Sequence, residues 1–234
     1  MTTPSEKVWT GPLDVAEWPE KLTARVVTPG ARPRLHGYDV EADLARHYSF
    51  TETVLLALTG ELPTAAEARA FDVALQFAAP ASAQEAPTHA TILARICMAS
   101  TSQMQGVAAI ALAEQARVLV TQHQRWIEML KGPLAVIPPE ACATSDGERE
   151  SVDRLRHALR GTVDVPALSH DLGRPAAVLA TLHACGLKSV EAIECALVLA
   201  RLPVAMAEAL STPSGSHRQY PVQLPRIAYT EEPS

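Results

Sequence analysis

Histidine side chains are the groups in this sequence that best fit acid–base chemistry, because an imidazole gains or loses a proton near neutral pH. The chain has eight of them: His36, His47, His89, His123, His157, His170, His183 and His217. None belongs to an H-E-x-x-H pair, and the sequence also lacks G-x-G-x-x-G, G-x-x-x-x-G-K-[ST] and G-x-S-x-G. The absence of these motifs argues against zincin, Rossmann, P-loop and α/β-hydrolase sites.

His89 is the histidine with the best placed surroundings. It follows Pro87 in "EAPTHATILARI" and falls in the first turn of a predicted helix. Backbone N–H groups and the dipole at such an end favour an anionic ligand. His89 is therefore a candidate carboxylate-binding residue, although the sequence favours the simpler interpretation of a histidine that only lies near a helix start.

Two other groups are weaker candidates. His170 and Asp171 are adjacent in "ALSHDLG", where side chains rarely hydrogen-bond to each other and where a helix N-cap is the simpler interpretation. His217 and Arg218 stand in "SGSHRQYP" near the C-terminus. These two residues either close over an anion or remain in solvent, and the sequence does not separate the two.

The four cysteines indicate neither a disulfide framework nor a metal site. Cys97, Cys142, Cys185 and Cys195 form no C-x-x-C pair, and no histidine stands at metal-ligand spacing from them. Three lie in apolar helical stretches, so we expect reduced, buried thiols. We expect neither a metal nor a cofactor.

Composition indicates a helical protein without a nucleic-acid or membrane partner. Hydrophobic residues make up 47% of the 234, whereas aromatic residues make up only 4%, a balance that favours an all-α fold. The net charge is −6 and no run of basic residues is present, which argues against nucleic acid. The N-terminal segment lacks a signal-peptide pattern and no apolar stretch is long enough to span a bilayer, so we expect a cytoplasmic protein.

Helix start and stop signals give a map of the chain. Ser49–Glu52, Thr64–Glu67 and Ser145–Glu148 each place a hydroxyl residue three positions before a glutamate, which predicts helix starts. Gly60 and Gly186 fit helix ends with left-handed backbone. Helices are predicted at about 39–48, 50–59, 64–79, 87–101, 105–131, 148–160, 174–185 and 189–211.

The predicted organisation has four parts. Residues 1–35 are an extended, proline-containing arm, and 36–131 are the first part of a helical core. Residues 132–147 form a linker, and 148–234 contain a reduced small domain, a returning core helix and a C-terminal arm. The helices at 105–131 and 189–211 are apolar around most of their circumference, which predicts a central position or a subunit interface. Pro203 is expected to kink the second.

Several stretches resemble the citrate synthase superfamily, which includes ATP-citrate lyase and citryl-CoA lyases. "GYDVEADLA" (37–45) and "SFTETVLLALTGELPT" (49–64) are similar to its G-Y-[DP]-I-x-x-L-A and F-x-E-V-x-x-L-L-x-x-G-E-L-P-T segments. "PTHATILARICMAST" (87–101) and "LPRIAYTE" (224–231) are similar to P-S-T-x-x-A-R-x-x-A-S-T and R-P-R-x-x-Y-T-G. The resemblance implies a citrate-synthase-like helical bundle, mainly the large domain, with the small CoA-closing domain reduced. It also implies a homodimer and acyl-CoA/2-oxo acid C–C bond chemistry.

The catalytic motifs of that family are not matched. Where D-H-E is expected, "FAAPASAQEA" (77–86) contains no histidine, and where H-G-G-A is expected the chain reads "RVLVTQ" or, in a second register, has Ala135. Pro175 stands at the position of the catalytic aspartate, with Asp171 four residues earlier. The resemblance keeps Arg95 and Arg226 as weak substrate-binding candidates together with Arg218.

Three hypotheses for function follow. In the first, the chain has a degenerate catalytic set and acts as a partner subunit, either as a homodimer or with an intact citrate-synthase-like paralogue. In the second, it is a shortened citryl-CoA-lyase-like enzyme that uses His89, His170, Asp171 or His217. In the third, it is a sensor of a carboxylate or a CoA thioester. Enolising a thioester needs a base and oxyanion donors, each worth about 10² or more in rate, so the first hypothesis is preferred.

Overall fold

The structure is a computed structural model that describes residues 24–133 and 136–215. The chain divides into two compact units, with the boundary between Ser49 and Phe50. Each unit is described separately below.

The first unit contains a small antiparallel sheet followed by a helical segment. Its strands pair in the order β1–β2–β3, and their bounds are β1 Val27–Thr28, β2 Arg34–Leu35 and β3 Tyr38–Asp39. His36 and Gly37, which join β2 to β3, both have positive φ (+46° and +87°), the backbone of a two-residue type I′ hairpin turn. The sequence did not predict these strands.

The helical segment predicted at 39–48 is confirmed. A π-helical turn, Val40–Leu44, leads directly into α1, Ala45–His47. The carboxylate of Asp39 accepts hydrogen bonds from the backbone N–H groups of Glu41 (3.0 Å) and Ala42 (2.8 Å), and so caps the turn. These bonds, above all the one from Ala42, lower the pKa of Asp39 below its usual value.

The second unit consists of helices, their connections and one isolated β-bridge, between Cys142 and Leu172, among its described residues. Its helices are α2 Phe50–Thr59, α3 Ala65–Ala78, α4 Ala86–Ile96, α5 Thr101–Gln122, α6 Gln124–Met129, α7 Asp146–Ala158, α8 Arg174–Ala184 and α9 Val190–Ser211. Two 3₁₀ turns, Pro139–Ala141 and Pro166–Ser169, lie in the connections. The prediction of an all-α fold is confirmed.

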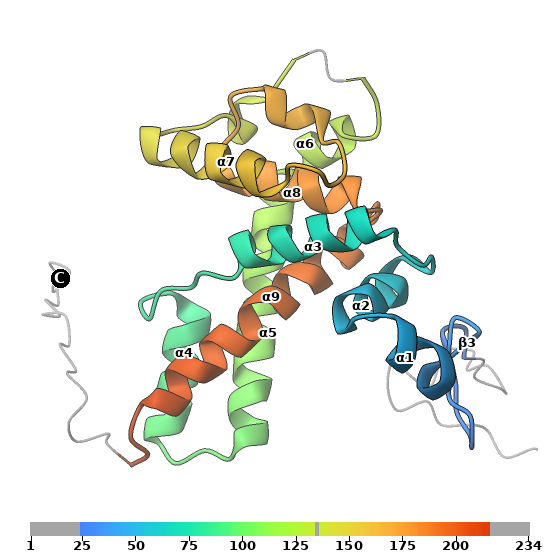
Figure 1. Ribbon diagram of the computed structural model, residues 1–234. Helices are drawn as coiled ribbons and strands as arrows, with labels where there is room; N and C mark the ends of the chain where they lie inside the picture. Colours follow the sequence, from blue (N-terminus) through green and yellow to red (C-terminus); the bar gives the residue numbers. More distant parts are fainter. Residues whose placement is uncertain (1–23, 134–135, 216–234) are drawn as a thin grey trace, which may run out of the picture. The chain divides into compact units, whose positions relative to one another are not determined.

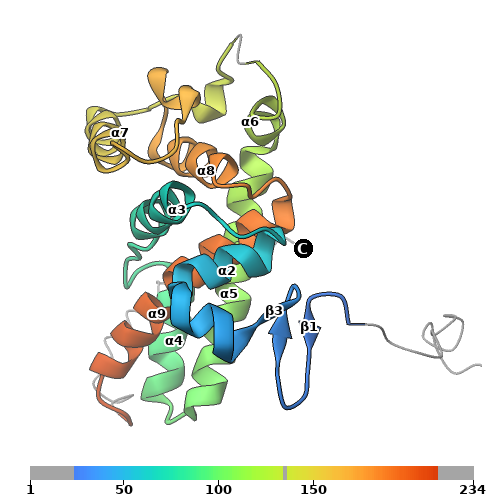
Figure 2. The ribbon, with the colours of Figure 1, turned by 45° about the vertical axis from the view of Figure 1, so that its right-hand side comes forward.

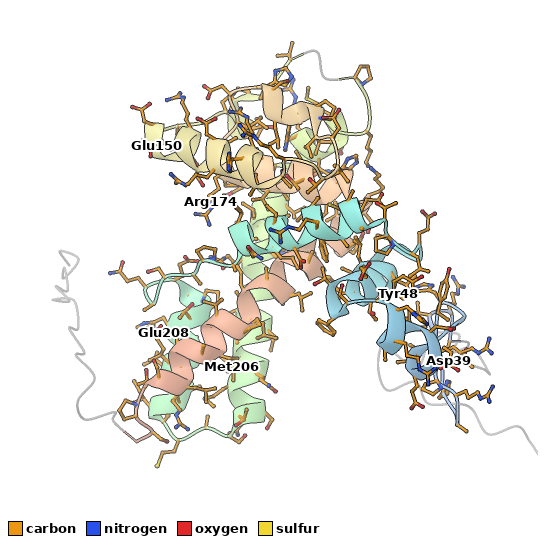
Figure 3. All side chains as sticks on the ribbon, in the orientation of Figure 1. Asp39, Tyr48, Glu150, Arg174, Met206 and Glu208 are labelled. Atoms are coloured by element: carbon orange, nitrogen blue, oxygen red, sulfur yellow. The ribbon has the colours of Figure 1, made fainter. Side chains whose placement is uncertain are left out.

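The long helices α5 and α9 hold this unit together. They pack against each other, α4 packs against both, and α3 lies between α8 and α9 (Figures 1 and 2). Met206 of α9 packs with Met104 and Ala108 of α5 (Figure 3). The largest apolar cluster joins α2, α3, α5, α6, α7, α8 and α9 and includes Phe71 and Trp126, both fully buried.

Helix ends agree with the sequence signals at several points. Thr64 and Glu67 form a complete capping box, and Gly60 and Gly186 have φ of +82° and +95°. Ser145 caps α7, but the carboxylate of Glu148 accepts its return hydrogen bond from the backbone N–H of Thr144 (2.7 Å) instead of from Ser145.

Two predicted helices have different bounds in the structure. The helix predicted at 87–101 ends at Ile96, and the next begins at Thr101 because Ser100 and Gln103 form a capping box. The helix predicted at 105–131 is two helices, α5 and α6, separated at His123. The segment predicted as a linker, 132–147, contains the 3₁₀ turn at Pro139–Ala141 and the first residues of α7. The four-part division of the chain stays a prediction.

Candidate functional site

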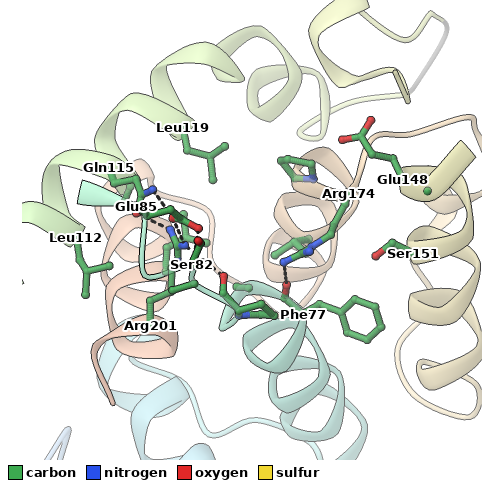
Figure 4. A pocket seen from close by; sticks show the side chains of 18 of the residues that line it. Phe77, Ser82, Glu85, Leu112, Gln115, Leu119, Glu148, Ser151, Arg174 and Arg201 are labelled. Atoms are coloured by element: carbon green, nitrogen blue, oxygen red, sulfur yellow. Dashed lines mark hydrogen bonds and ion pairs between the residues drawn. The ribbon is translucent and has the colours of Figure 1, made fainter. Parts of the chain in front are cut away.

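A large pocket in the second unit has a volume of about 810 Å³. It is lined by the end of α3, the loop after it, the middle of α5 and α9, and the first turns of α7 and α8 (Figure 4). Its volume is in the range of small-molecule sites. Its charged lining residues are Glu85, Glu148, Arg154, Arg174 and Arg201.

At one end of the pocket, three polar side chains from separate elements form a closed ring. Arg201 of α9 donates to Glu85 and to the side-chain oxygen of Gln115 of α5. The amide of Gln115 in turn donates to the same oxygen of Glu85 (2.8 Å). Figure 4 shows these three side chains pointing toward one another.

Backbone groups of the loop before α4 complete this ring. The backbone N–H of Ser82 donates to the other oxygen of Glu85 (3.0 Å), and Arg201 also donates to the carbonyl of Pro80 (3.2 Å). Partial burial acts to raise the pKa of Glu85, but the hydrogen bonds from Ser82, Gln115 and Arg201 and the charge of Arg201 outweigh it and hold that pKa below its usual value. At neutral pH, Glu85 is therefore ionised, and both of its carboxylate oxygens are hydrogen-bonded within the protein.

The other end of the pocket carries arginines with fewer partners. Arg174, in the first turn of α8, donates from one Nη to the carbonyl of Phe77 (2.8 Å). Among the described residues no carboxylate forms an ion pair with Arg174. Arg154 of α7 lies 3.7 Å from Glu150, in an exposed pair one turn away. This end therefore offers guanidinium groups to an anion.

The acid–base groups of the pocket are carboxylates. No histidine is among its described lining residues. Glu85 is held by three donors, and a carboxylate that is hydrogen-bonded in its charged form is a weak base. One oxygen of Glu148 accepts from both the N–H and the hydroxyl of Thr144. The arginines of the pocket suit binding of an anion.

The residues predicted from the sequence lie elsewhere. His89 is on α4 and Arg95 is near its end, where the Arg95 Nε donates to the carbonyl of Thr212 (3.3 Å) and ties α4 to the end of α9. Asp171 is exposed and pairs with Arg149 (3.1 Å). None of these residues lines the large pocket. His217, Arg218 and Arg226 lie outside the described residues.

His170 contributes to a second, smaller pocket of about 400 Å³ together with His183 of α8. His183 is 8% exposed, and its Nε2 is buried without a hydrogen-bond partner among the described residues. Burial first, and then the charges of Lys188 and Lys131, lower the pKa of His183 to about 4. His183 is therefore a neutral, buried histidine at pH 7.

Among the described residues there is no cluster of three His, Cys, Asp or Glu side chains that would hold a metal ion. A search of the same residues finds no helix that is both long and apolar enough to cross a membrane.

Comparison with known proteins places the fold. The citryl-CoA lyase of Hydrogenobacter thermophilus is similar in structure, with a TM-score of 0.62 at 16% sequence identity over 91% of this chain and 97% of that chain. The chain therefore shares the overall fold of this citryl-CoA lyase. An ATP citrate lyase of Methanosaeta concilii, a D541A mutant solved with (3S)-citryl-CoA, has a TM-score of 0.60 at 13% identity; the match covers 93% of this chain and 43% of that one. No protein-family model and no curated protein sequence matches the chain.

Sequence reasoning missed the four residues that form the polar ends of the pocket: Glu85, Gln115, Arg174 and Arg201. One signal was present. Arg201 is the only charged residue between Glu194 and Glu208 of the apolar helix α9, and a charged side chain on a buried helix is seldom kept without a partner or a ligand.

Proposed function

We propose that this protein is a non-catalytic relative of the enzymes that form or cleave C–C bonds between acyl-CoA and 2-oxo acids, and that it works as a partner subunit. One observation carries the proposal. The large pocket has guanidinium groups for an anion, but its described lining residues include no histidine and its carboxylates are held by internal donors. Losing base and oxyanion donors together removes several factors of about 10² in rate.

The ligand of this pocket is an anion, either a small carboxylate or a CoA thioester. The support comes from Arg174, which has no carboxylate partner among the described residues and lies in the first turn of α8, where the helix dipole also favours negative charge. The two similar enzymes are named for citryl-CoA or citrate, and both of these compounds are anions. A sensor of such a ligand is the second candidate function, and the same arginine favours it.

The partner role is supported by an apolar strip on α5. Its residues Val107, Ile110 and Val118 are 37%, 74% and 42% exposed, while the opposite side of α5 is buried against α4 and α9. Exposed apolar side chains that share one helix face favour a protein contact. The partner is a second copy of this chain or an intact citrate-synthase-like paralogue.

An active enzyme that uses relocated groups is less well supported. It would need His89, His170, Asp171 or His217 beside the anion-binding groups. His89 lies on α4 outside the pocket lining, Asp171 is paired with Arg149, and His217 is outside the described residues. His170 lines a different pocket. The geometry therefore favours binding over turnover.

Two measurements test the proposal. The purified full chain, assayed with citryl-CoA, should release acetyl-CoA no faster than the buffer; turnover that His89→Ala, His170→Ala or Asp171→Asn abolishes would contradict the proposal. Light scattering of the chain alone, and of the chain coexpressed with an intact paralogue, should show a dimer or a heteromer.

A matched pair of substitutions tests the strip on α5. Ile110→Glu should shift the chain to the monomer, whereas Val136→Glu, which makes the same charge change at a valine that is 70% exposed outside α5, should not. A chain that is monomeric on its own and ignores the paralogue would refute the partner role.

A further inference from the structure

In the ring of Glu85, Gln115 and Arg201, a carboxylate of the protein itself binds the arginine in the way that an anionic ligand would. The side chain of Arg201 is 16% exposed and that of Glu85 is 33% exposed, so the pair is shielded from much of the solvent. Arg201 directs one Nη at Gln115 and the other at Glu85. These are the donors that would otherwise hold the carboxylate of a ligand, because guanidinium nitrogens bind carboxylates through charge-assisted hydrogen bonds.

We propose that Glu85 determines the ligand specificity of the pocket by occupying Arg201. This proposal deepens the proposed function and rests on it in one respect, that the pocket binds an anion. With Glu85 in place, the pocket has one anion-binding end, at Arg174, and one neutralised end, at Arg201. A ligand that presents one anionic group to the pocket fits it, whereas a ligand that presents an anionic group to each end, such as a tricarboxylate, does not.

The lining between the two ends agrees with this ligand class. Leu112 and Leu119 of α5, Val178 of α8 and Leu197 of α9 all face the pocket. Figure 4 shows Leu112 and Leu119 on the side of the Glu85 ring, with Arg174 and Glu148 on the other. An apolar chain that extends from an anionic group at Arg174 would lie along these side chains.

A second carboxylate at Arg201 meets two obstacles. If Glu85 stays, two carboxylates lie side by side near one cation, and like charges this close disfavour each other. If Glu85 leaves, its carboxylate loses the donors from Ser82, Gln115 and Arg201. Breaking a partly buried ion pair is costly because it leaves a charge without compensation.

The test compares citrate binding by the wild-type chain and by Glu85→Gln, using calorimetry at pH 7. Glutamine has the shape of glutamate and can still accept from Arg201, but it carries no charge. We expect citrate to bind Glu85→Gln about tenfold more tightly than the wild type, which corresponds to about 1.4 kcal/mol of binding free energy. The double variant Glu85→Gln/Arg201→Gln should lose this gain, which shows that the new affinity comes from Arg201.

The controls separate charge and folding from specificity. Glu191→Gln removes the same charge from an exposed position in the first turn of α9 and should bind citrate as the wild type does. Thermal unfolding checks that each variant is folded, and Glu85→Ala replaces Glu85→Gln if that variant is not. A gain below about fivefold, or a gain that survives the loss of Arg201, overturns the proposal. Turnover of citryl-CoA by the wild type would overturn the proposed function but not this comparison.

Discussion

Lowering the pH from 7 to 5 should destabilise the folded chain through His183. Its imidazole is 8% exposed on α8, and its Nδ1 lies 3.4 Å from the Nζ of Lys188. The ammonium group of Lys188 also donates to the carbonyl of His183 (2.8 Å), which fixes it beside the ring. Protonating this ring places a second positive charge in a buried position next to Lys188.

The sign and size of the effect follow from the two pKa values. Burial and the two lysines lower the pKa of His183 to about 4 in the folded chain, from an ordinary value of 6.5. Between these values the unfolded chain binds more protons, so the free energy of unfolding falls as the pH falls through this window. The loss from pH 7 to pH 5 is about 2 kcal/mol, and it approaches about 3 kcal/mol below pH 4.

Urea denaturation at pH 7 and pH 5, at one protein concentration, measures this loss. His183→Gln removes the titrating group, so the variant should lose about 2 kcal/mol less than the wild type between the two pH values. His157→Gln, at an exposed position on α7, is the matched control and should keep the wild-type loss. Equal losses in the wild type and in His183→Gln would refute the reasoning, because the carboxylates that remain titrate in both.

Three further predictions concern the frame of the second unit. Gly186→Ala should lower the free energy of unfolding by about 1 kcal/mol because φ is +95° there. Gly106→Ala in α5, with open space around it and no positive φ, should instead raise the free energy of unfolding by up to about 1 kcal/mol. Thermal or urea unfolding measures both. Cys185, buried and with its pKa raised by burial to about 12, should react with iodoacetamide far more slowly than the exposed Cys97, as peptide mass spectrometry would show. Trp126→Phe should cost about 1–3 kcal/mol in urea denaturation, because the fully buried indole loses its hydrogen bond to α8 and part of its contact area.

Local signals predicted the helices of this chain well because they act within a few residues. The capping box of Thr64 and Glu67 spans three positions, and the glycines at 60 and 186 end helices through their own backbone. Where the prediction was wrong, a local signal had been overlooked: Ser100 and Gln103 start α5 four residues earlier than predicted. The hairpin turn at His36 and Gly37 was also missed. Its two flanking strands have two residues each, which is too short to show a strand pattern in the sequence.

The pocket could not be predicted in this way, because its polar residues meet only through tertiary packing. Glu85, Gln115 and Arg201 stand 30 and 86 positions apart in sequence order, and no short motif joins them. A search for histidines therefore pointed to His89, which lies in α4, four residues after Glu85, but outside the pocket lining. Asp171 was a candidate for the base, yet the packing of α7 places Arg149 beside it.

Part of the frame of the second unit is separate from the pocket, so the fold does not depend on every residue that lines the pocket. The residues that fix the frame, such as Phe71, Trp126 and the capping box at Thr64, do not line the large pocket, so a change inside the pocket leaves them in place. The polar groups of the pocket are paired because a buried arginine without a partner would lower the free energy of unfolding. Glu85 provides that partner for Arg201. A pocket that carries its own counter-charge is stable when empty.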